Sequence, residues 1–149
     1  NTGIPLQYPG GDPSFIPMPP VEQWRRSYVF LVPQNYAFDF VQVVAPAGTS
    51  ITLDGDALPT ADCTLTRGDG CVETRTHSCP PSLWDVYNCQ LSFPHIDPSL
   101  PYPQNLAAGR QGDGVHVVNA TAPSAVIVSG FDLRVSYGYP AGTQLRPLF

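Results

Sequence analysis

The sequence predicts an all-β fold, a β-sandwich or jelly-roll-like barrel with a disulfide-stapled loop insertion and an extended proline-rich N-terminal segment. Apolar and polar residues alternate in several short windows, which is the period of a strand, and no window has convincing helical spacing. Eighteen prolines and thirteen glycines, which disfavour helix interiors, break up the chain. The 149 residues suit one domain with a core of useful size.

Residues 1–23 are rich in proline and have no periodic apolar pattern. This composition favours extended backbone, partly in polyproline II form. We expect the segment to pack against the remainder of the chain, residues 24–149, which form a single β-sandwich domain. The side chains expected to anchor it are Leu6, Tyr8, Phe15, Ile16 and Met18.

The sequence predicts the first strands directly after the N-terminal segment. In residues 28–32, Tyr28, Phe30 and Val32 share one face. Residues 38–45 are apolar on both faces apart from Asp39 and Gln42, as in a central strand that is covered on both sides. Residues 49–54 place Ile51 and Leu53 inward, and the Asp54-Gly55 pair that follows is a turn signal.

The final third predicts further strands at 115–119 and 125–130, separated by a turn at Pro123, and a possible edge strand at 144–146. Residues 131–137 alternate as one strand, with Phe131, Leu133, Val135 and Tyr137 facing inward.

All four cysteines, Cys63, Cys71, Cys79 and Cys89, fall in residues 60–95. Their even number and their spacings, unlike those of a zinc site, predict two disulfides in an irregular insertion, with short strands around 72–76 and 86–93. Disulfides place the protein outside the reducing cytosol. Four cysteines permit three connectivities; we favour Cys63–Cys71 with Cys79–Cys89, because each closes a short loop.

Charge excludes some partners. The net charge is −5, and the seven basic residues, all arginine, are scattered. This distribution argues against binding to nucleic acid or to an anionic membrane. No apolar run approaches the length of a membrane span.

Short ordered motifs resemble a known family. They lie at residues 21–24, 28–33, 36, 40–49 and 53–55, and again at 114–116, 130–132 and 135–142. Together they are similar to IgGFc-binding protein N-terminal-like domains, which occur in large exported or lipid-anchored proteins of myxobacteria and related bacteria. The resemblance implies a β-rich extracellular binding or adhesion domain. It does not imply antibody binding, and it supplies no catalytic residue to carry over.

The main candidate binding residues are four aromatic side chains in and after the insertion. Exposed on one face, they would stack on sugar rings or anchor a protein partner; buried, they would form a small core under the loop. These residues are Trp84, Tyr87, Phe93 and Tyr102.

Other motifs are weaker. Arg67-Gly68-Asp69 is an integrin-type tripeptide or a chance sequence in a turn. Asp54 and Asp56, which Asp113 could join through the fold, hint at calcium, but their spacing does not fit an EF-hand and a turn explains them better. His77, His95 and His116 lack metal-ligand spacing. His116 is a general base without a nucleophile, or more simply a structural histidine. We therefore assign no catalytic residue, no metal and no cofactor.

Three functions remain open. The first is a non-catalytic extracellular or cell-surface domain that binds or adheres to a protein or glycan. The second is a structural subunit of an extracellular fibre or surface layer, whose residues 1–23 add a strand to another copy. The third, a polysaccharide or peptide hydrolase, ranks last because the ten aspartates and two glutamates lie mostly in turn-like contexts.

Overall fold

The computed structural model describes residues 11–34, 36–68, 70–97, 99 and 107–144. The predicted all-β fold class is confirmed. The described elements are one 3₁₀ turn, η1 (Val21–Gln23), and the strands β1 (Arg25–Val32), β2 (Phe38–Pro46), β3 (Ile51–Leu53), β4 (Asp56–Ala57), β5 (Cys63–Arg67), β6 (Val72–Glu73), β7 (Trp84–His95), β8 (Ala107–Arg110), β9 (Gly114–Asp132) and β10 (Val135–Pro140).

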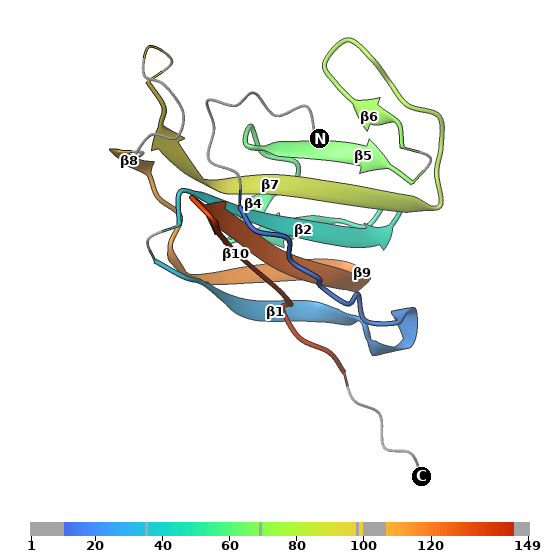
Figure 1. Cartoon of the computed structure of the whole chain (residues 1–149). Coiled ribbons are helices and arrows are strands. Elements are labelled where there is room, and N and C mark those ends of the chain that lie inside the picture. Colours follow the sequence, from blue (N-terminus) through green and yellow to red (C-terminus); the bar gives the residue numbers. More distant parts are fainter. Residues whose placement is uncertain (1–10, 35, 69, 98, 100–106, 145–149) are drawn as a thin grey trace.

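The long strand β9 joins the two layers of one curled antiparallel sheet (Figure 1). Its first half pairs with β1 and β3, so that Val118 lies opposite both Tyr28 and Leu53. Its second half pairs with β2 and β10, where Val128 lies opposite Val41. The sheet then continues from β2 through β7 and β5 to β6.

The sequence predicted two strands separated by a turn at Pro123, and this was wrong. β9 runs through Pro123 as one strand, and its main pairing partners change close to that residue, from β1 and β3 before it to β2 and β10 from Ala125 onward. Proline has no N–H to donate to a ladder, so it is tolerated where the strand passes from one set of neighbours to the other.

The core lies between the layers, and the predicted inward faces of the first strands are confirmed. Tyr28, Phe30 and Val32 are at most 4% exposed, and Ile51 and Leu53 are also buried. They meet buried residues of the opposite layer, which are Val41, Val43, Ala45, Tyr87, Cys89, Val126 and Val128. As predicted, β2 is central, with β7 on one side and β9 on the other.

Tyrosine hydroxyls tie strand ends together. The Tyr28 hydroxyl accepts a hydrogen bond from the Arg25 N–H (2.8 Å) and donates one to the Ser124 carbonyl. On β10, the Tyr139 hydroxyl donates to the Leu31 carbonyl and accepts from the Leu31 N–H (3.2 Å). Burial raises the pKa of both phenols. Tyr139 therefore links β10 to β1, strands that do not pair with each other.

A buried carboxylate lies on the inward face of β2. Asp39 of β2 is fully buried, between Ser92 on β7 and Gly130 on β9. The Tyr137 hydroxyl donates to Asp39 Oδ1 (2.6 Å), whereas Oδ2 has no hydrogen-bond partner in the described part of the chain. Burial is the main cause that raises the pKa of Asp39. Glycine is required opposite it, because a Cβ on Gly130 would lie 2.5 Å from Oδ1 and 2.4 Å from the Tyr137 ring.

Residues 60–95 are more regular than predicted: the irregular backbone was wrong in part, whereas the short strands predicted around 72–76 and 86–93 are present as β6 and within β7. They form β5, β6 and the twelve-residue β7, which is paired on both sides. The favoured disulfide connectivity was also wrong, since the bonds join Cys63 to Cys89 and Cys71 to Cys79. Cys63 and Cys89 lie directly opposite each other on β5 and β7, with Cα atoms 4.0 Å apart. Strand pairing rather than loop length therefore decides which cysteines meet.

Two other predictions need correction. Residues 131–137 are a hairpin rather than one strand, because residues 133–134 form the turn between β9 and β10 and Val135 is 41% exposed. In the N-terminal segment, Ile16 packs against Gly138, but Phe15 and Met18 are 92% and 49% exposed and so are not buried anchors. The anchors Leu6 and Tyr8 and the edge-strand residues 145–146 lie outside the described residues.

Candidate functional site

The three predicted aromatic residues that the structure describes do not form one surface. Tyr87 points inward and is 6% exposed in the core, while Trp84 is half-buried and makes an edge contact with Trp24 at 5.3 Å. Phe93 lies near the other end of β7, roughly 30 Å from Trp84 at the rise of an extended strand. The guanidinium of Arg110 covers the Phe93 ring at 4.0 Å. Tyr102 lies outside the described residues.

The Arg-Gly-Asp tripeptide begins inside the sheet. Arg67 is the last residue of β5, and its guanidinium lies 2.5 Å from the buried carboxylate of Asp85. The Gly68 N–H donates to the Trp84 carbonyl (2.9 Å), which continues the β5–β7 pairing. Asp69 lies outside the described residues. Because the Arg67 side chain is engaged by Asp85, an integrin-type display of this tripeptide is not supported.

His116 forms a structural link. Its Nδ1 lies 2.6 Å from Asp54 Oδ2 and its Nε2 lies 2.8 Å from the Gly112 carbonyl, and its ring stacks on Phe30. The other carboxylate oxygen of Asp54 accepts the Val117 N–H. With both ring nitrogens facing acceptors, the side chain fastens the β3–β4 turn to β9. Asp54 and Gly55 both have positive φ in this turn, as the Asp-Gly motif predicted.

A small polar pocket lies beside that turn. Its volume is about 200 Å³, and its lining includes Asp54, Asp56, Asp62, Gln90 and Arg110. Arg110 Nη2 lies 2.7 Å from Asp62 Oδ2, so the cationic group in the pocket already has an anionic partner. The pocket is smaller than the roughly 300–1,000 Å³ of most small-molecule sites.

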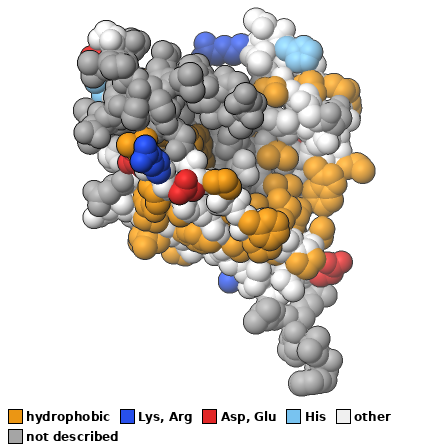
Figure 2. Space-filling model, in the orientation of Figure 1, with side chains coloured by type: hydrophobic (Ala, Val, Ile, Leu, Met, Phe, Trp, Pro, Cys, Tyr) orange, Lys and Arg blue, Asp and Glu red, His pale blue; other side chains and the backbone are white. Residues whose placement is uncertain are grey.

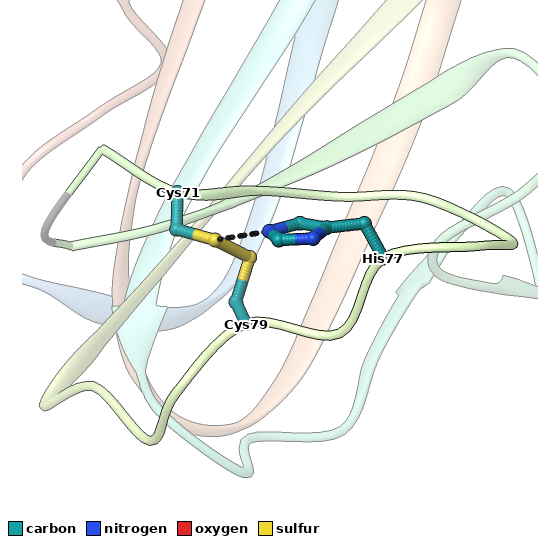
Figure 3. Close-up of side chains that lie close together, drawn as sticks. All are labelled: Cys71, His77 and Cys79. Carbon is teal, nitrogen blue, oxygen red and sulfur yellow. Dashed lines mark hydrogen bonds between the residues drawn. A yellow bond between two sulfur atoms is a disulfide. The ribbon is translucent and has the colours of Figure 1, made fainter.

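Two half-buried cysteines, Cys71 and Cys79, are close to an exposed histidine. The Cys71 and Cys79 sulfurs and a ring nitrogen of His77 lie within 4.8 Å of one another (Figure 3). Two thiolates and an imidazole would form a soft metal-ligand set. In this structure the sulfurs are bonded to each other, so they are not thiolate ligands.

A different surface is more unusual, namely the outward side of β1 and of the first half of β9. Leu31 lies opposite Val115, and Val29 lies opposite Val117. The exposed fractions of Val29, Leu31 and Val115 are 64%, 56% and 69%. An uncharged polar border adjoins these residues and consists of Ser27, Asn119 and Thr52. Asn119 lies opposite Ser27 on β1 and opposite Thr52 on β3. We call this set of seven residues the β1/β9 face.

The β1/β9 face contains no charged residue; Asp54, which accepts the Val117 N–H, lies beside it. Charged side chains are also sparse among the hydrophobic ones on the side of the molecule shown in Figure 2. Sequence reasoning missed the β1/β9 face, although a signal was present. Residues 28–32 are apolar at every position, so a strand with one buried face must expose apolar residues on the other unless something covers it.

Comparison with known proteins assigns the chain to a family. The IgGFc binding protein family matches residues 5–130, most of the chain. Comparisons with curated proteins and with solved structures find no match. Among the described residues no helix has both the length and the hydropathy needed to span a membrane. The chain belongs to the IgGFc binding protein family.

Proposed function

We propose that this chain is a non-catalytic cell-surface adhesion domain that binds a protein partner through the β1/β9 face. Family membership and the two disulfides indicate an extracellular binding domain. The observation that carries the proposal is the row of Val29, Leu31 and Val115, each more than half exposed, on adjacent strands.

The chemistry of this face suits a protein better than a glycan. Glycan recognition relies on stacked aromatic rings, and the described aromatic candidates are buried, covered or far apart. Protein interfaces combine an apolar centre with a polar border, and charged residues are depleted at their cores. Aliphatic side chains bordered by Ser27, Asn119 and Thr52 fit that description.

β1 also has an open side. Among the described strands it pairs only with β9. The Leu31 N–H and carbonyl bind the Tyr139 hydroxyl, so Leu31 directs its backbone groups away from β9. By the alternation of antiparallel pairs, Val29 and Ser27 direct theirs to the same side. A partner that covers the β1/β9 face would therefore find the backbone donors and acceptors of Ser27 and Val29 at its margin, whereas those of Leu31 are already bonded to Tyr139.

The test is retention of surface proteins by two triple variants. Val29→Thr/Leu31→Thr/Val115→Thr places the β-branched residue threonine, which favours strands, at all three positions and makes the face polar. Val72→Thr/Leu83→Thr/Val135→Thr is the matched control, since these three residues are 45%, 83% and 41% exposed elsewhere. Each immobilised domain is incubated with cell-surface proteins and, separately, with a purified IgG Fc fragment. Bound proteins are cross-linked to the domain and identified by mass spectrometry.

We expect the wild type and the control to retain the same protein, and the face variant to bind it at least tenfold more weakly, about 1.4 kcal/mol. Equal retention by all three domains would remove the β1/β9 face from the proposal. Retention by none would count against protein binding by this domain.

A second function, a subunit of an extracellular fibre or layer, is favoured by the exposure of Phe15, Met18 and Val21 in the N-terminal segment. Such a segment could dock on another copy. Analytical ultracentrifugation of the wild type and Phe15→Ser tests it: a self-association that the substitution abolishes supports the fibre, and a monomer at all concentrations contradicts it.

A further inference from the structure

The Cys71–Cys79 disulfide lies at the edge of the sheet, in the connection between β5 and β7. β6 is the last strand of the sheet and pairs with β5 through only two residue pairs. The Arg67 N–H donates to the Cys71 carbonyl (2.7 Å), which fixes the position of this cysteine. Beyond β6, the backbones of Thr74 and His77 exchange hydrogen bonds of 3.0 and 3.4 Å. This tight turn brings the His77 ring back over the disulfide (Figure 3).

The two disulfides differ in access. Cys89 is 1% exposed, and its bond to Cys63 crosses two paired strands that form part of the core. Cys71 and Cys79 are only half-buried, and His77 beside them is exposed. Thiol–disulfide exchange requires an attacking sulfur to approach along the S–S bond. Cys63 is half-buried like Cys71 and Cys79, so the difference lies in Cys89, and Cys71–Cys79 is the disulfide in which both cysteines are partly exposed.

His77 also favours one direction of attack. Its Nε2 lies 3.4 Å from Cys71 Sγ. An imidazole N–H next to a sulfur stabilises the thiolate and makes that sulfur the better leaving group. We propose that the Cys71–Cys79 disulfide is a thiol-exchange site, at which an external thiolate attacks Cys79 and His77 stabilises the departing Cys71 thiolate.

The step balances without a further reactant. A bond forms between the incoming sulfur and Cys79 Sγ, the Cys71–Cys79 bond breaks, and its electron pair leaves with Cys71 Sγ. The His77 Nε2–H hydrogen-bonds the new thiolate. The external thiol is thereby oxidised to a mixed disulfide on Cys79, and Cys71 is reduced. The substrate class is a thiol, either a small molecule or a cysteine of another protein.

Reduced glutathione tests the site on the folded wild-type chain. Samples are quenched with acid, free thiols are alkylated, and peptides are mapped by mass spectrometry over time. We expect glutathione on Cys79, alkylation of Cys71, and exchange at least about tenfold faster than at Cys63–Cys89. Glutathione predominantly on Cys71, or opening of Cys63–Cys89 first, overturns the proposal.

The role of His77 has its own variant and control. His77→Phe keeps an aromatic ring but removes the N–H, and His95→Phe makes the same change at an exposed site on β7. We expect His77→Phe to slow exchange about three- to tenfold and His95→Phe to leave it unchanged. Equal rates in the two variants overturn the role of His77. The peptide map of the wild type does not depend on whether either variant folds.

Discussion

Removal of the Cys63–Cys89 disulfide should cost more stability than removal of Cys71–Cys79, although the two bonds share one region of sequence. A disulfide stabilises the folded state mainly by restricting the unfolded chain. The effect grows with the logarithm of the number of residues in the loop that the disulfide closes. The sequence separations are 26 and 8 residues. For these loops the chain-entropy relation gives about 3.5 and 2.5 kcal/mol at 25 °C.

Packing increases the difference in stability that is expected between the two disulfide variants. Cys89 is 1% exposed and belongs to the core cluster, so replacing its sulfur by hydrogen in Cys89→Ala leaves a small void, which adds roughly 1 kcal/mol. Cys71 and Cys79 are half-buried in the loop at the sheet edge, where neighbouring atoms and water fill the space. We therefore expect a loss of about 4–5 kcal/mol for Cys63→Ala/Cys89→Ala and of about 2–3 kcal/mol for Cys71→Ala/Cys79→Ala.

Urea unfolding of the two double variants and the oxidised wild type, followed by tryptophan fluorescence, measures both costs by linear extrapolation. The ordering is the critical result. If the Cys71→Ala/Cys79→Ala variant proves the less stable of the two, then the arrangement of β5 against β7 and the loop sizes inferred from it are wrong.

Three further predictions concern the core. Gly130→Ala should cost about 1–3 kcal/mol because its Cβ would meet Tyr137 and Asp39, and an unchanged urea midpoint would contradict that packing. Folding raises the pKa of Asp39. The stability that this carboxyl group contributes to the folded state is therefore full at a pH below its unfolded pKa and is lost as the pH rises through its folded pKa. Wild type should therefore gain stability over Asp39→Asn as pH falls from 7 towards 4, and parallel urea curves at all pH values would refute the raised pKa. Tyr139→Phe should cost about 0.5–1.5 kcal/mol and speed hydrogen exchange at the Leu31 amide, whereas unchanged exchange there would show that the Tyr139 hydroxyl does not link β10 to β1.

Local alternation was enough to predict several elements. The inward faces of residues 28–32 and 51–53 follow from a period of two, and the Asp54-Gly55 pair supplies the positive φ that the tight hairpin turn requires. These features depend on neighbours within a few residues. That is why they could be inferred without knowing which strands pair.

Features that depend on distant partners could not be predicted. Pro123 has the sequence signature of a turn, but it lies within β9, close to the point where the main partners of that strand change from β1 and β3 to β2 and β10. Arg134 adopts φ 59° in a hairpin turn that contains no glycine or asparagine to mark it. The disulfide connectivity follows from the pairing of β5 with β7, a contact between residues 26 positions apart.

The candidate site also combines a feature that can be read from the sequence with features that depend on distant strands. The apolar residues at positions 29, 31 and 115 can be read from the sequence. Their exposure cannot, because it depends on β9 being the only described strand that pairs with β1. Conversely, Trp84, Tyr87 and Phe93 are close in sequence, yet strand alternation and strand length separate them.

The most direct test of the proposed function is a hydrogen-exchange footprint of the wild-type domain with and without the protein partner it retains. We expect slower exchange in residues 27–31 and 115–119, with the amides of Ser27 and Val29 among those protected. Protection confined to residues 63–95, with unchanged exchange in both segments of the β1/β9 face, would contradict the account.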